Sequence, residues 1–184
     1  MAELTAEDRL EIIDLLHRYM FILDGGENHD NGYEYAELYT EDGSFMNRPA
    51  GREELARAAG RTPDGGMAPS GQRGPHNVMH INVGEVIVPT DEGARGTNYL
   101  LMIDGAGGQI YWAGWYEDEY VKTPKGWRFK SRNHIFGPKA GMPANGRAMR
   151  DALARLAEEG AGGAPEPSSE PIARDPLNWV DGKV

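Results

Sequence analysis

Apolar residues near the start of the chain recur at three- and four-residue intervals: Leu10, Ile13, Leu16 and Met20. This spacing is typical of an amphipathic helix and predicts one over residues 5–24. Thr5 is a candidate N-cap, and Gly25-Gly26 provides a stop signal at the far end.

Shorter patterns predict the next elements. Residues 33–40 indicate a second, short helix that ends at the turn 41–43, and residues 44–47 indicate a short strand. Residues 52–59 indicate a third helix, and residues 60–75, rich in Gly and Pro, a loop.

Four strand-like runs follow, separated by Gly, Asp and Pro turn signals: Asn77–Val88, Gly96–Asp104, Gln109–Lys122 and Trp127–Phe136. Their regular spacing predicts an antiparallel meander. Helices that precede strands in this way indicate the α+β fold class.

The last part of the chain differs in composition. Residues 145–159 predict an amphipathic helix, and the stretch 160–176, rich in Gly, Pro and Ser, is typical of a linker. Trp179 is either a dangling side chain or part of a tail that docks on a neighbouring subunit. We therefore expect one domain over residues 1–140 and a C-terminal helix and extension over residues 141–184.

Composition and charge narrow the classes of function. The 184 residues suit one domain, and a net charge of -10 without any Lys/Arg run argues against a nucleic-acid partner. The lack of cysteine excludes disulfides, thiolate catalysis and zinc–thiolate sites. No apolar run approaches the ~20 residues of a membrane span, and the N-terminus carries acids where a signal peptide needs basic residues. We expect no membrane partner and a cytoplasmic location.

Asp24 lies at the C-terminal end of the first predicted helix. A carboxylate there meets the negative end of the helix dipole, which is unfavourable, so a functional role would explain it. The alternative is a solvated residue of an Asp-Gly-Gly turn.

His76 begins a predicted strand after a Gly/Pro loop, where its side chain could enter the mouth of a pocket. Paired with Asp24, its imidazole would be oriented for proton abstraction near neutral pH. The alternative is a structural histidine. His80 has the same strand parity as His76 and is a second candidate, either lining the same cavity or bonding a neighbouring strand.

Tyr19 and Arg132 are further candidates for the catalytic machinery. Tyr19 lies about 140° around the helix from Asp24, yet both could reach one pocket because the chain turns there. Arg132 shares one face of the last strand with Lys130 and His134, opposite Phe129. An inward Arg needs a partner; the alternatives are an outer salt bridge for Arg132 and a core position for Tyr19.

Substrate contacts are expected from the middle strands. Asn98 and Tyr99 lie on one strand, and Trp115 lies on the next, in a run of aromatic residues that favours a flat, aromatic or polycyclic ligand although most of it belongs to the core. With His80 and His134 these residues form the expected substrate-binding set. His76 and His80 would stand roughly 13 Å apart on a strand, too far for one ion, so we expect no metal and no cofactor.

Five segments together resemble the SnoaL-like branch of the NTF2-like superfamily over about residues 5–137: HRYMFILDGG, AELYTEDGSF, GREELARAAG, GPHNVMHINV and GWRFKSRNHIF. The resemblance implies a cystatin-like cone, in which a strongly curved sheet wraps around the N-terminal helices and encloses an apolar pocket.

The resemblance also implies a chemistry. In the dehydratase and dehydrochlorinase relatives, an Asp at the position of Asp24 holds a catalytic His, and several relatives have an Arg at the position of Arg132. We therefore expect a cofactor-independent lyase that removes water, or formaldehyde by retro-aldol cleavage, from a small apolar or aromatic substrate. The bile-acid dehydratases have an acidic residue near Asn98, so identical chemistry is not expected.

Two alternatives stay open. The same Asp–His pair could serve an isomerase or cyclase, and related β subunits of ring-hydroxylating dioxygenases are not catalytic. A homo-oligomer is expected, with a trimer favoured by the resemblance.

Overall fold

The computed structural model describes residues 3–25, 28–49, 51–68, 78–104, 110–136, 180 and 182. The predicted helix over 145–159, the linker over 160–176 and the candidate His76 lie outside these residues. Val180, close to the chain end, is buried.

The first predicted helix is confirmed as α1 (Ala6–Gly25). Its buried face differs from the expected stripe, because Leu10 is 67% exposed. The buried residues of the helix are Asp8, Ile12, Leu15, Leu16, Tyr19 and Ile22. No helix among the described residues is long and apolar enough to cross a membrane.

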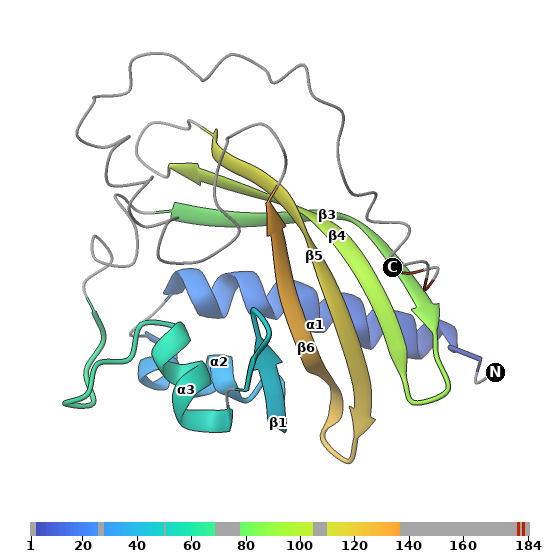
Figure 1. The fold of residues 1–184 in the computed structure, drawn as a ribbon, viewed down its shortest axis with the longest axis horizontal. Helices are drawn as coiled ribbons and strands as arrows, with labels where there is room; N and C mark the ends of the chain where they lie inside the picture. Colours follow the sequence, from blue (N-terminus) through green and yellow to red (C-terminus); the bar gives the residue numbers. More distant parts are fainter. Residues whose placement is uncertain are drawn as a thin grey trace.

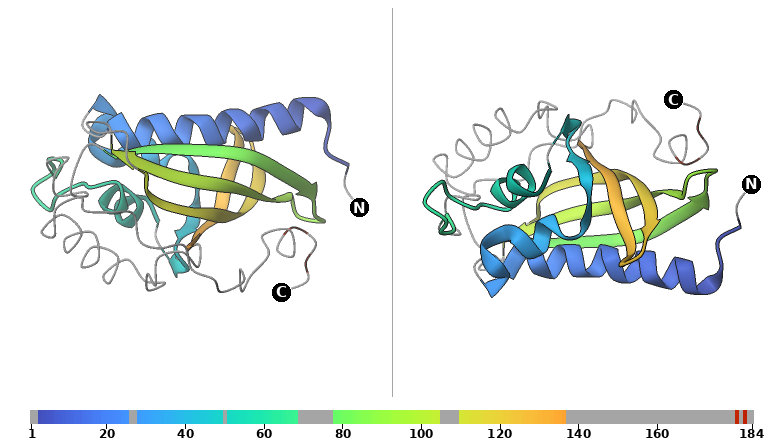
Figure 2. Two further views of the ribbon diagram at one scale, coloured as in Figure 1. Left: turned by 90° about the horizontal axis from the view of Figure 1, so that it is seen from above. Right: turned by 90° about the horizontal axis from the view of Figure 1, so that it is seen from below.

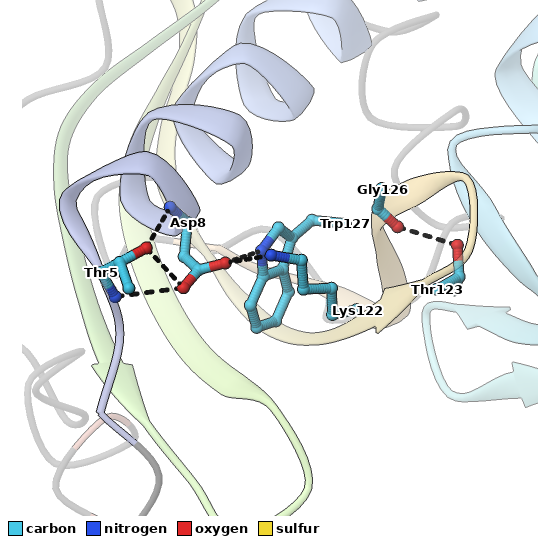
Figure 3. Close-up of polar contacts among 6 residues, drawn as sticks. All are labelled: Thr5, Asp8, Lys122, Thr123, Gly126 and Trp127. Carbon is cyan, nitrogen blue, oxygen red and sulfur yellow. Dashed lines mark hydrogen bonds and ion pairs between the residues drawn. The ribbon is translucent and has the colours of Figure 1, made fainter.

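A reciprocal capping box starts α1 (Figure 3). The Asp8 backbone N–H donates to Thr5 Oγ1 over 3.0 Å, and the Thr5 N–H donates to Asp8 Oδ2 over 3.1 Å. Asp8 Oδ1 also accepts from Lys122 Nζ at 2.7 Å and from Trp127 Nε1 at 3.0 Å. One side chain therefore both caps the helix and joins it to the last hairpin of the sheet.

The region between the helices folds differently from the prediction. The second helix, α2 (Tyr33–Ala36), is short and follows the 3-10 turn η2 (Asp30–Gly32), whereas the strand β1 already begins at Tyr39 (Tyr39–Phe45). Pairing of β1 with the last strand draws residues 39–43 into the sheet and overrides their helix and turn signals.

Two short elements complete this region. The strand β2 (Arg48–Pro49) pairs with β1, and the third predicted helix is confirmed as α3 (Gly51–Ala58). Helix α2 packs against α3, and α3 packs against β1, at the end of the sheet opposite to β3 (Figure 1).

The four predicted long strands are confirmed within one residue at their ends, except that the second begins at Ala94, two residues before the predicted Gly96. They are β3 (Val78–Pro89), β4 (Ala94–Asp104), β5 (Ile110–Thr123) and β6 (Gly126–Phe136). The sheet order is β2-β1-β6-β5-β4-β3. The expected antiparallel sheet is mixed, because β1 runs parallel to β6. The sheet is open and curved, as in cystatin-like folds (Figure 1).

Helix α1 runs alongside the edge strand β3 (Figure 2). Arg9 Nη1 donates to the Ile87 carbonyl over 2.7 Å, and the Asn82 N–H donates to Met20 Sδ over 3.0 Å. Near the end of the helix, Asp24 accepts the backbone N–H of His80, two residues before Asn82 on the strand. Side chains of α1 thus occupy backbone groups that an edge strand otherwise leaves open.

Candidate active site

Several polar side chains are buried on the face of the sheet that packs against α1, here called the inner face: Asn82, Asn98, Asp118, Arg132 and His134. Buried polar groups are costly unless they are paired. Their concentration on one face, between aromatic residues, makes the inner face the candidate site for chemistry.

Asp24 and His80 form a close pair at the end of α1. Asp24 Oδ1 lies 2.5 Å from His80 Nδ1, and Oδ2 accepts the His80 backbone N–H over 2.9 Å. Their side chains are only 24% and 14% exposed, respectively. A carboxylate at Nδ1 favours the tautomer with the proton on Nδ1, which leaves the lone pair of Nε2 available as a base.

Among the residues that the structure describes, the histidine that meets Asp24 is therefore His80, the second candidate from the sequence. The described part of β3 begins at Val78, and His80 is the residue whose N–H reaches the end of α1. Both oxygens of Asp24 are engaged by His80. His76 lies outside the described residues.

A second polar group surrounds Arg132. Its Nη1 lies 2.8 Å from Asp118 Oδ2, and both residues are fully buried. Asp118 Oδ2 also accepts from Tyr120 Oη at 2.9 Å and from Asn98 Nδ2 at 3.3 Å. Burial raises the pKa of Asp118 to about 6, so the carboxyl is still ionised at neutral pH.

Aromatic rings enclose the Arg132 guanidinium. Its Cζ lies 3.5 Å from the ring centroid of Tyr116, 4.1 Å from that of Tyr19 and 4.8 Å from that of Phe129. Nε and Nη2 of Arg132 and Oδ1 of Asp118 have no hydrogen-bond partner among the described residues. Within the described part of the chain, the cation thus keeps two donor nitrogens without a partner, in a setting of low dielectric.

Tyr19 connects α1 to this group. It is fully buried, and its hydroxyl lies 3.4 Å from the hydroxyl of Tyr116. Burial raises the pKa of Tyr19 well above its ordinary value. The hydroxyl therefore keeps its proton and can act as a donor.

His134 lies between the two groups. Its ring is 5.1 Å from the ring of Tyr116, its register partner. Burial, followed by the charges of His80 and Arg132, lowers the pKa of His134 to about 3. His134 is therefore neutral at physiological pH, and both polar groups act on it electrostatically.

Two expected substrate contacts lie elsewhere. Tyr99 and Trp115 are register partners on the outer face of the sheet. Tyr99 is 55% exposed, and Trp115, although buried, directs Nε1 to Glu117 at 3.4 Å. Strand alternation sends them away from Arg132, whereas Asn98, next to Tyr99, belongs to the inner face.

Sequence reasoning missed Asn82 and Asp118. Asn82 has the strand parity of His80, a signal that was available. Asp118 lies opposite Arg132 in the β5–β6 hairpin, but only because of a local register shift that the sequence does not show. Within the described residues no three metal-ligating side chains come together.

The chain matches the family model of the SnoaL-like domain over residues 4–133. No curated protein matches it. Among solved structures it is similar to a protein of unknown function with a cystatin-like fold from Nostoc punctiforme, with 21% identity, a TM-score of 0.62, and coverage of 77% of this chain and 100% of that one.

Two further solved structures share the fold. An NTF2-like protein from Novosphingobium aromaticivorans has 22% identity and a TM-score of 0.57, covering 80% of this chain and 88% of its own. ActVI-ORFA from Streptomyces coelicolor has 18% identity and a TM-score of 0.56, covering 72% and 97%. These likenesses establish the NTF2-like, cystatin-like fold.

Proposed function

The chain belongs to the SnoaL-like family, and from that premise we propose that it is a cofactor-independent lyase whose base is His80, held by Asp24. The observation that carries the proposal is the short contact between the Asp24 carboxylate and His80 Nδ1. Their chemistry needs neither a metal nor a cofactor.

The base acts through its second nitrogen. His80 Nε2 takes a proton from a carbon or hydroxyl of the substrate, and the Asp24 carboxylate stabilises the resulting imidazolium. A positioned base of this kind typically contributes ~10²–10⁴-fold to the rate. The imidazolium then returns the proton to the group that leaves.

The leaving oxygen needs a donor as it gains charge. Arg132 offers Nε and Nη2, which have no partner among the described residues, and the Tyr19 hydroxyl stays protonated beside it. Donors held in a dry site stabilise a developing charge more than they would in water. Loss of water fits this arrangement, and retro-aldol loss of formaldehyde would use the same groups.

The aromatic surroundings favour an apolar substrate. Rings of Tyr19, Tyr116 and Phe129 lie against the guanidinium of Arg132, and flat apolar ligands pack well against such rings. We assign the substrate to small aromatic or polycyclic compounds that carry oxygen.

Proton abstraction can be measured with a generic carbon acid. Hydrogen–deuterium exchange of the α protons of 2-tetralone in D₂O, followed by NMR, requires a base but no leaving group. We expect wild-type protein to accelerate exchange and His80→Ala to lower the rate by on the order of 10²–10⁴.

His76→Ala is the matched control and should keep wild-type exchange. Loss of exchange in His76→Ala with full activity in His80→Ala would transfer the role to His76. Absence of exchange by the wild type, or unchanged exchange in both variants, would remove the lyase proposal.

An isomerase or cyclase is the second candidate, because the same base can return its proton to another carbon of the substrate. The same partly exposed pair, Asp24 and His80, would serve both reactions. Mass spectrometry of the product distinguishes them, since isomerisation leaves the mass unchanged whereas elimination lowers it.

A further inference from the structure

Asn82 lies two residues after His80 on the same strand. Side chains at this spacing share one face and stand roughly 7 Å apart. Asn82 is 5% exposed, and its backbone N–H donates to Met20 Sδ at 3.0 Å. The helix thus fixes the backbone of Asn82 and leaves its side chain beside the base.

The side-chain amide of Asn82 is buried, and its hydrogen-bonding groups are not paired by any described residue. Neither Nδ2 nor Oδ1 has a hydrogen-bond partner among the described residues. An unpaired buried amide destabilises a protein. By contrast, Thr97 Oγ1 on the neighbouring strand donates to the Tyr116 carbonyl at 2.8 Å. Asn82 therefore offers both a donor and an acceptor that no residue of the described part of the chain takes up.

Apolar packing surrounds this amide. Leu100, the register partner of Asn82 on β4, is fully buried, and Met20 of α1 contacts the backbone N–H of Asn82 through Sδ. In such a setting a hydrogen bond to a charged oxygen is stronger than in water. The environment of the Asn82 amide therefore suits a substrate oxygen that becomes negatively charged only during the reaction.

We infer that Asn82 binds the substrate oxygen that gains negative charge when His80 removes the neighbouring proton. The inference rests on the proposed function and specifies its substrate: a ketone with an acidic α proton, rather than a hydrocarbon or an isolated alcohol. Asn82 Nδ2–H donates to the carbonyl oxygen, and Oδ1 can accept from a hydroxyl of the same substrate.

The electrons and protons balance without a further reactant. His80 Nε2 takes the α proton, the electron pair of the C–H bond forms a carbon–carbon double bond, and the carbonyl electrons move to the oxygen held by Asn82. In elimination the carbonyl re-forms, the double bond moves to the α and β carbons, and the β hydroxyl leaves as water with the proton from His80.

Ligand preference tests the inference directly. 2-Naphthol resembles the enol of 2-tetralone, whereas naphthalene lacks the oxygen. We expect wild-type protein to bind 2-naphthol more tightly than naphthalene, and Asn82→Leu to lose most of this preference while still binding naphthalene. The same variant should exchange the α protons of 2-tetralone on the order of 10²-fold more slowly, as for the loss of one oxyanion donor.

Thermal stability provides the second readout. Because the amide has no hydrogen-bond partner within the described residues, Asn82→Leu should keep or raise Tm. Asn133→Leu is the matched control: its Oδ1 accepts the Asn47 N–H at 2.8 Å, so this variant should lower Tm but keep the ligand preference and the exchange rate.

The outcomes separate this inference from the proposed function. A lower Tm for Asn82→Leu, or an unchanged preference for 2-naphthol, would overturn the role of Asn82 whether or not the wild type exchanges 2-tetralone. Absence of exchange by the wild type would instead overturn the lyase, and wild-type exchange that persists in Asn82→Leu would count against Asn82 alone.

Discussion

The carboxylate of Asp24 binds His80 twice, with Oδ1 at the ring Nδ1 and Oδ2 at the backbone N–H. The first contact sets the tautomer of the proposed base, and the second fixes the strand to the helix. Orientation of the imidazole therefore does not depend on the side chain alone.

Asp24→Asn should reduce exchange of 2-tetralone by on the order of 10²–10⁴ with little change in fold. The amide that this substitution introduces can donate to Nδ1 of His80 and so favours the tautomer that carries the proton on Nε2. In that tautomer Nε2 has no free lone pair and cannot act as the base. NMR exchange rates check this, with circular dichroism for the fold. Asp14→Asn, an exposed change on the same helix, should have wild-type activity; equal rates for the two variants would contradict the role of Asp24.

Asp118→Asn and Arg132→Met should each destabilise the protein by about 3–5 kcal/mol at pH 7, because each leaves a buried group without its partner. The double variant Asp118→Asn/Arg132→Met should recover part of that loss, since it removes both charges. Urea unfolding of the four proteins gives the coupling free energy. Additive losses would show that the two side chains do not interact across the 2.8 Å contact.

His134→Gln should reduce the loss of unfolding free energy that occurs when the pH is lowered from 7 to 5. In the folded protein His134 is neutral, because its pKa is lowered to about 3. In the unfolded chain the same imidazole takes up a proton below the ordinary histidine pKa of about 6.5. Acidification from pH 7 to pH 5 therefore costs the wild type roughly 2 kcal/mol through this residue. Urea unfolding at the two pH values should show a smaller loss in the variant; an equal loss in both proteins would mean that His134 is protonated in the folded state.

Thr5→Ala should lower the free energy of unfolding by about 1 kcal/mol, because it removes the hydroxyl that accepts the Asp8 N–H. Thr5→Ser keeps this hydroxyl and should be close to wild type. Chemical denaturation measures both. A Ser variant as unstable as the Ala variant would show that the methyl group, rather than the cap, stabilises this end of α1.

Local patterns were sufficient for the long elements. The end of α1 at Gly25 and the four long strands follow from periodicity and turn residues, which act over a few positions. The position of Asp24 at the helix end could therefore be predicted. Tyr39 could not be assigned to a strand, because the pairing that places it there comes from β6, far along the chain.

The polar group around Arg132 depends on a single extra residue. From the turn, Tyr120 pairs with Phe129, but the next pair is Glu119 with Ser131, so Lys130 is skipped. This bulge brings Arg132 to the face of Phe129, which the prediction had placed on the opposite face, and sets it against Asp118. Bulges of this kind leave no clear mark in a single sequence, so this part of the site could not be derived from it.

The contacts of α1 along β3 give Asp24 a structural role that is independent of the proposed reaction. Its Oδ2 occupies an N–H at the margin of the sheet, where an open group invites pairing with another chain. Loss of this acid would therefore open the edge strand to other chains as well as release the proposed base. An Asp24 that oriented no base would still shield this edge of the sheet from pairing with another chain.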